Sequence, residues 1–193
     1  IIKNRVRKIF SFAESSGTIP YAIIIKNGIE GQLDSTFFYL SNIRSGLFEG
    51  CSIIAYPSGS ISVLTSKLEE QSALETPDIE VITFENESEY KKLLNKKLMK
   101  IRILGINYGE ITLGNYLWIK KNFQRIKLID LSKPITRARC IKDEMEIKLL
   151  KKSANIASKV FPVIIRSLEK DITESQLSSI INYNMENQGA SSP

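Results

Sequence analysis

Paired carboxylates are the first residues in this sequence whose type and spacing suggest chemistry, because two such groups can act as general acid and base. Glu144 and Glu146 form such a pair, but they stand two residues apart, so on a helix they point to different faces. A place near the positive N-terminus of a helix explains them without a catalytic role. The sequence contains no histidine, which excludes Ser-His-Asp and Cys-His arrangements within the chain. We therefore predict no catalytic residue in this chain.

Metal-binding and phosphate-binding motifs are also missing from the sequence. Cys51 and Cys140 lie far apart and neither belongs to a CxxC motif, so no structural zinc site is expected. Gly105 and Gly109 follow an expected strand, but the Lys-Ser/Thr pair of a phosphate-binding loop does not follow them. Two acidic clusters are interpreted as exposed helix starts: Glu69-Glu70 and residues 85–89. We predict no metal ligand in this chain.

Three consecutive aromatic residues, Phe37, Phe38 and Tyr39, stand close to Arg44. Such a group could stack single-stranded bases, but its alternation is poor, and packing in the core is the other interpretation. Lysine and arginine exceed aspartate and glutamate by 27 − 21 = 6, and the lysine pairs fall on helical patterns that are typical of solvated faces. We expect no nucleic-acid partner and keep an RNase-H-like nucleic-acid-binding domain as an alternative.

The first 132 residues alternate between strand and helix patterns, with enough apolar residues for a core. Strands are expected at 21–25, 36–40, 51–56, 61–65, 80–84, 101–106 and 125–129. Helices are expected near 6–13, 67–74, 87–98 and 112–122. Residues 57–60 are a turn that joins two strands into a hairpin. Strands that alternate with helices favour parallel pairing, and the hairpin adds an antiparallel pair. The prediction is an α/β domain with a mixed β-sheet flanked by helices.

A boundary is expected at Ser132-Lys133-Pro134, beyond which the pattern becomes helical only. Ser132 can cap a short helix over 135–139, with proline just inside its first turn. We therefore predict a domain over 1–132, a linker with a short helix over 133–142, and the start of a second domain over 143–193.

Two capping boxes predict two helices in this last segment, the first at Asp143 with Glu146 and the second at Thr173 with Gln176. Pro162 lies inside the first helix and should kink it or end it early. Each helix carries an apolar stripe: Ile147, Leu150, Ala154, Ala157, Phe161, Ile164 and Leu168 on the first, and Leu177, Ile180, Ile181 and Met185 on the second.

Four segments appear in the order and spacing of a known family. Arg139–Ile147 reads Arg-Cys-Ile-Lys-Asp-Glu-Met-Glu-Ile, and Thr173-Glu174 starts a helix. Met185–Ala190 ends in Gly-Ala, and Phe38–Asn42 reads Phe-Tyr-Leu-Ser-Asn, with Ser and Asn in place of the family's Thr and Gly. In these segments the chain resembles the creatinase/aminopeptidase P/prolidase family, the two-domain members of the "pita-bread" metallopeptidases.

The resemblance implies a creatinase N-terminal, RNase-H-like domain followed by the first two helices of a truncated pita-bread α+β domain. The chain begins at Ile1 rather than at a methionine, and we expect it to be an N-terminal fragment with no hydrolytic activity of its own. The full-length parent would bind two divalent metal ions (Mn, Co or Zn) through two aspartates, a histidine and two glutamates. The order of motifs places all five ligands after Pro193. The parent would hydrolyse peptides with proline after the first residue, and it would form a homodimer.

The resemblance also places the loop after the expected 36–40 strand at the edge of the parent's substrate entrance or at the subunit interface. This loop carries Asn42 and Arg44, a neutral hydrogen-bonding group and a fixed cation, which could engage a substrate's backbone or carboxylate end. In the other interpretation Arg44 only caps a surface loop.

A non-catalytic family member that uses the same domain as a protein-binding module remains a further alternative, because such a relative would share the N-terminal architecture. No apolar run is long enough to span a bilayer, so no membrane partner is expected. The chain shows no secretory signal, and a cytoplasmic location is the expectation.

Overall fold

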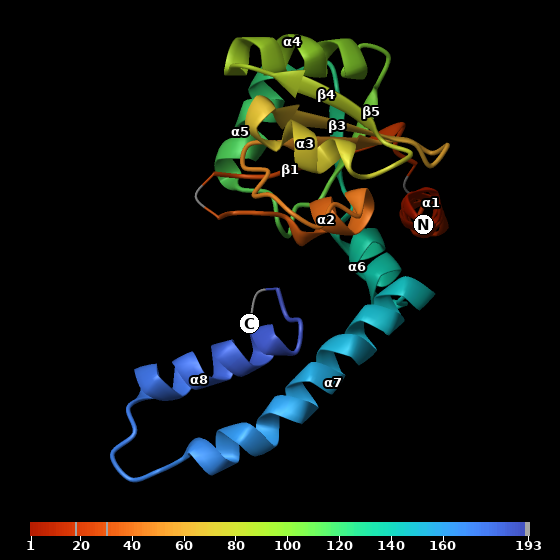
Figure 1. Ribbon diagram of the computed structural model, residues 1–193. Helices are drawn as coiled ribbons and strands as arrows, with labels where there is room; N and C mark the ends of the chain where they lie inside the picture. The colour runs from red at the N-terminus through yellow and green to blue at the C-terminus, as the bar shows by residue number, and fades with distance from the viewer. Residues whose placement is uncertain (18, 30, 192–193) are drawn as a thin grey trace. The chain divides into compact units, whose positions relative to one another are not determined.

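The computed structural model describes residues 1–17, 19–29 and 31–191, and it divides into two compact units, Ile1–Cys140 and Ile141–Pro193 (Figure 1). A short helix, α6 (Ser132–Cys140), belongs to the first unit, where it packs against the first helix, α1 (Ile2–Ser15). The helix expected over 135–139 begins three residues earlier than predicted, at Ser132.

The described part of the first unit contains a six-stranded sheet in the order β4-β3-β2-β1-β5-β6. The strands are β1 (Ala22–Lys26), β2 (Ser52–Ala55), β3 (Ile61–Ser66), β4 (Glu80–Phe84), β5 (Ile103–Ile106) and β6 (Lys127–Asp130). Strand β2 runs antiparallel to both of its neighbours, and the other neighbouring pairs are parallel. At the centre, Ile24 of β1 stands opposite Ile54 of β2 and Ile106 of β5. The predicted mixed sheet and its hairpin between β2 and β3 are confirmed.

Helices cover both faces of this sheet, because the strands are apolar on both sides (Figure 1). In β1, Ile23 and Ile25 join a core with α1, α2 (Ser35–Ser41) and α6. Ala22 and Ile24 point the other way, into a core with α4 (Glu87–Leu98) and α5 (Leu113–Asn122). A 3-10 turn, η1 (Lys67–Glu69), and the short helix α3 (Glu70–Leu74) connect β3 to β4.

One predicted strand is wrong, because residues 36–40 lie in helix α2. The aromatic residues there favour strands, but local capping decides in favour of a helix. The Asp34 side chain accepts a hydrogen bond from the Thr36 N–H at 2.8 Å, and Asn42 ends the helix in a left-handed conformation with φ 57°. The rings of Phe37 and Tyr39 are buried, so the interpretation of the aromatic cluster as core is confirmed.

The second unit consists of α7 (Glu144–Ser167) and α8 (Glu174–Asn187), and both predicted capping boxes are present at their starts. Helix α7 continues five residues past Pro162, so the helix does not end early there, and the alternative, a kink at Pro162, stays a prediction. A proline removes only one backbone N–H donor, and the turns on either side keep theirs. Among the described residues, no helix is long and apolar enough to cross a membrane.

The apolar stripe of α7 is largely exposed to solvent. Phe161 is 61% exposed and Leu150 is 56% exposed, whereas the buried side chains of α7 are Ile156 and Val160. Helix α8 therefore covers only a narrow strip of α7, and much of the apolar surface of the two helices is exposed among the described residues.

Candidate functional site

Asn42 and Arg44 lie in the loop that leads from α2 to β2. Asn42 is half-buried at the end of α2, where its backbone N–H donates to the Phe38 carbonyl at 2.9 Å. Asparagine tolerates the left-handed conformation better than most side chains do, which fits its place in the turn. Arg44, two residues on, is exposed.

Both side chains line one hollow of about 260 Å³ on the first unit. Its other lining residues come from α3 and the segment that follows it: Ser72, Glu75, Thr76 and Pro77. The lining of the hollow therefore includes a cation, an amide and the acidic residue Glu75. Such a surface can bind a charged or hydrogen-bonding chain end.

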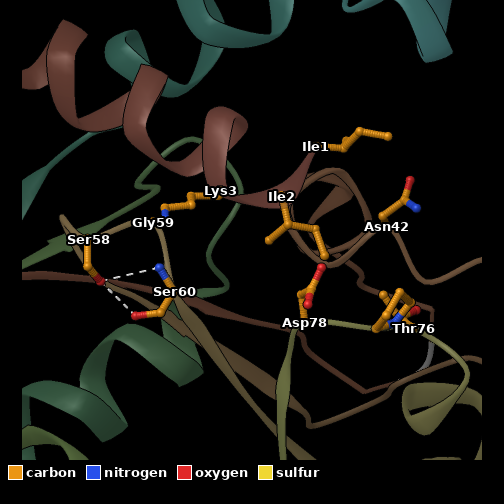
Figure 2. Close-up of a pocket in the computed structure, with 10 residues that line it drawn as sticks. Ile1, Ile2, Lys3, Asn42, Ser58, Gly59, Ser60, Thr76 and Asp78 are labelled. Atoms are coloured by element: carbon orange, nitrogen blue, oxygen red, sulfur yellow. Dashed lines mark hydrogen bonds between the residues drawn. The ribbon is translucent and has the colours of Figure 1, made fainter.

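A larger hollow of about 630 Å³ adjoins the first one through Asn42, Thr76 and Pro77. Figure 2 shows Asn42 and Thr76 at one end and the hairpin-turn residues Ser58 and Ser60 at the other. The Ser58 Oγ atom contacts both the N–H and the Oγ atom of Ser60, at 3.3 and 2.7 Å. Ile1, Ile2, Lys3, Gly59 and Asp78 complete the lining. The two hollows form a mixed polar and apolar surface that suits an extended chain better than a single ion.

A buried polar network lies where β1 and β5 end, and sequence reasoning missed it. The Asp34 carboxylate, 3% exposed, accepts from the Thr36 N–H and from Asn107 Nδ2 at 3.0 Å. Asn27, which is fully buried, accepts from the Asp34 N–H at 3.1 Å. The sequence signals this network only in that Asn27 and Asn107 directly follow apolar strands. The network fixes the loop that precedes α2.

Arg139, the first residue of the segment that carries the resemblance, approaches the same network. Its Nη1 atom donates to Thr36 Oγ1 at 3.5 Å, and its guanidinium lies 6.0 Å from the ring centre of Tyr39. Tyr39 in turn contacts the Ala138 carbonyl through its hydroxyl at 3.5 Å. Arg139 therefore ties the last turn of the first unit to α2.

Lys26 is a half-buried lysine at the end of β1. Its Nζ atom donates to the Gly50 carbonyl at 3.1 Å and lies 4.2 Å from the ring centre of Tyr90. Burial lowers the pKa of Lys26 to about 8, although the aromatic ring favours the charged form. The ring centre of Trp118 lies 5.5 Å from the same Nζ atom, next to the ring of Tyr90.

The glycines of the Gly105-x-x-x-Gly109 segment have structural roles. A Cβ atom on Gly105 would lie 2.1 Å from Leu131 Cδ1, so only glycine allows this leucine to pack over β5. The Gly109 N–H already donates to Ser132 Oγ at 2.9 Å. No group of three or more Cys, Asp or Glu side chains that could hold a metal ion occurs in the described ranges.

A family model described as the creatinase/prolidase N-terminal domain matches residues 5–141, which are most of the first unit. The chain belongs to this family. Among curated proteins, this creatinase/prolidase N-terminal domain chain is 29% identical over 197 residues to an Xaa-Pro dipeptidase of Pyrococcus horikoshii, and it covers 50% of that protein.

Solved structures agree with this assignment at the level of the fold. An Xaa-Pro dipeptidase from Bacillus anthracis matches with a TM-score of 0.80 and 19% identity over 100% of this chain and 51% of its own. The prolidase of Pyrococcus horikoshii matches with a TM-score of 0.78 and 24% identity over 98% of this chain and 50% of its own. The creatinase/prolidase N-terminal domain chain thus spans about half the length of the relatives it matches.

Proposed function

We propose that this chain is the N-terminal portion of a metal-dependent Xaa-Pro dipeptidase or aminopeptidase. The observation that supports this most is the family match over residues 5–141, together with relatives named Xaa-Pro dipeptidase that are about twice as long. The direct test is hydrolysis of an Xaa-Pro dipeptide by the full-length parent.

The residues present in this chain do not fit a dinuclear metal centre. The sequence contains no histidine, and the part that the structure describes gathers no set of three acidic or thiol side chains. In the proposal, the two aspartates, one histidine and two glutamates that hold Mn, Co or Zn follow Pro193. When bound there, the metals would supply an activated water and polarise the scissile carbonyl.

The role proposed for this chain is to shape substrate access and to support a homodimer. Residues 143–193 would begin the pita-bread domain, and the exposed apolar stripe of α7 supports this, because an apolar helix face of this size is normally covered. The substrate would be a proline-containing peptide. The cytoplasmic location stays a prediction.

Arg44→Ala in the full-length parent is expected to raise KM for an Xaa-Pro peptide about tenfold, with little change in kcat. A charge-assisted hydrogen bond to a carboxylate contributes about 1.5–3 kcal/mol, and about 1.4 kcal/mol corresponds to a factor of ten. If Arg44 binds the substrate equally well in the ground state and in the transition state, its loss raises KM and leaves kcat unchanged. Steady-state kinetics over a substrate series measures both constants.

Arg125→Ala is the matched control, because Arg125 is also exposed but lies in the turn before β6, outside both hollows. It should leave both constants within twofold of wild type. If Arg44→Ala leaves kcat, KM and the dimer dissociation constant at wild-type values, Arg44 is an ordinary surface residue and the entrance role is wrong.

A further inference from the structure

The loop over residues 42–50, which we call the Arg44 loop, holds a phenylalanine in an uncommon backbone conformation. Phe48 has φ 53°, in the left-handed region that bulky side chains rarely adopt. Such a conformation persists only where the surroundings over-determine it, and it is often found at functional sites. The contacts that hold Phe48 therefore show how the loop is fixed.

Two groups of contacts hold Phe48 from inside the first unit. Its ring is fully buried, with its centre 5.3 Å from that of Phe37 and 6.2 Å from that of Phe38. Its carbonyl accepts from Asn27 Nδ2 at 3.0 Å. Because Asn27 belongs to the buried network around Asp34, the base of the Arg44 loop is tied to the core.

The carboxylate of Glu69 holds the tip of the same loop. Its Oε1 atom accepts from the Leu47 N–H at 2.9 Å and from the Phe48 N–H at 3.3 Å. Its Oε2 atom lies so close to Gly46, which has φ +100°, that a Cβ atom there would come within 2.2 Å of it. The expectation that Glu69 is merely an exposed helix start is wrong, because its half-buried carboxylate fills the inner side of the loop.

With its backbone donors turned inward to Glu69, the loop turns side chains outward. Residues 44–47 are all exposed, and Leu47 is 63% exposed although it is apolar. Arg44 and Leu47 together offer a cation and an apolar surface on a backbone that is already ordered. A preorganised loop binds its ligand without the cost of ordering at the moment of binding.

We infer that Glu69 is a positioning residue, which holds the Arg44 loop so that Arg44 meets the carboxylate end of a peptide substrate. This inference rests on the proposed function, since it assigns a substrate contact to Arg44. Glu69 itself touches only the loop backbone and acts through Arg44.

Hydrogen exchange on the 193-residue chain tests the anchor by itself. Glu69→Ala is expected to speed exchange of the Leu47 and Phe48 amides at least tenfold, because both donors lose their acceptor. Glu69→Gln keeps an acceptor oxygen and should retain most of the protection. Glu70→Ala, one position along and without these contacts, is the control and should leave both amides unchanged. Equal protection in Glu69→Ala and wild type would overturn the anchor.

A double-mutant cycle in the full-length parent tests whether Glu69 acts through Arg44. Glu69→Ala alone should raise KM about fivefold, and Glu69→Gln should restore most of the loss. In the Arg44→Ala background, Glu69→Ala should raise KM no further, because the contact it positions is already gone. Independent, multiplicative effects would overturn the positioning role. If Arg44→Ala has no effect while the amides still depend on Glu69, the proposed function of Arg44 fails and the anchor stands.

Discussion

Asp34→Ala is expected to lower the free energy of unfolding of the first unit by about 2–4 kcal/mol. The substitution removes the acceptor of the Thr36 N–H, which is the cap of α2 and is worth about 1 kcal/mol, and it removes the acceptor of one buried N–H of Asn107 Nδ2, at about 1–3 kcal/mol. Urea unfolding followed by fluorescence measures this change, because Trp118 of α5 is the chain's one tryptophan and lies in the first unit.

Two further variants sharpen this test. Asp34→Asn keeps a capping oxygen for the Thr36 N–H but turns one acceptor into a donor, so it should cost less than alanine does. Glu110→Ala, an exposed acidic residue after β5, should stay within about 0.5 kcal/mol of wild type. If Asp34→Ala lowers the free energy of unfolding no more than Glu110→Ala does, the buried network does not hold α2 in place.

Gly105→Ala is expected to destabilise the first unit by about 1–3 kcal/mol. The new methyl group would lie 2.1 Å from Leu131 Cδ1, and Leu131 is fully buried, so either the leucine or the strand must shift. The same urea titration measures the change. In a Leu131→Ala background the clash disappears, and the added cost of Gly105→Ala should largely vanish.

Gly114→Ala is the matched glycine control. Nothing lies within 4 Å of a Cβ atom at Gly114, which is in helix α5, so alanine there should be neutral or stabilise by up to about 1 kcal/mol. Equal losses at Gly105 and Gly114 would contradict the packing explanation, because only Gly105 has a neighbour that alanine would meet.

The sequence predicts those elements of the fold that local rules decide. The hairpin between β2 and β3 follows from turn residues between two apolar runs, and the starts of α7 and α8 follow from their capping boxes. Short segments in the right order indicate the family, and the match over residues 5–141 confirms it.

Elements that depend on tertiary contacts could not be predicted in the same way. Residues 36–40 carry strand-forming side chains, yet Asp34 caps them as a helix, and Asp34 is itself held by Asn107 from far along the chain. Glu69 looked like any acidic residue at a helix start, and its role depends on a loop more than twenty residues earlier in the chain. Such a contact leaves no periodic signal in the sequence.

The arrangement of the candidate site was only partly predictable. Sequence and resemblance together selected Asn42 and Arg44, and the structure shows that both line one hollow. Their neighbours Glu75 and Thr76 follow α3 and reach the hollow only through the fold. The role of the hollow in substrate entry stays a prediction.

The most direct test of the proposed function compares the full-length parent with the 193-residue chain in hydrolysis of an Xaa-Pro dipeptide, with Mn, Co or Zn added in turn. We predict turnover by the parent that a chelator abolishes, and no turnover by the 193-residue chain with any of the three metals, because it lacks a ligand set. Absence of turnover by the parent with all three metals would contradict the proposal and favour a non-catalytic binding module. Turnover by the 193-residue chain, once contaminating peptidases are excluded, would contradict it as well.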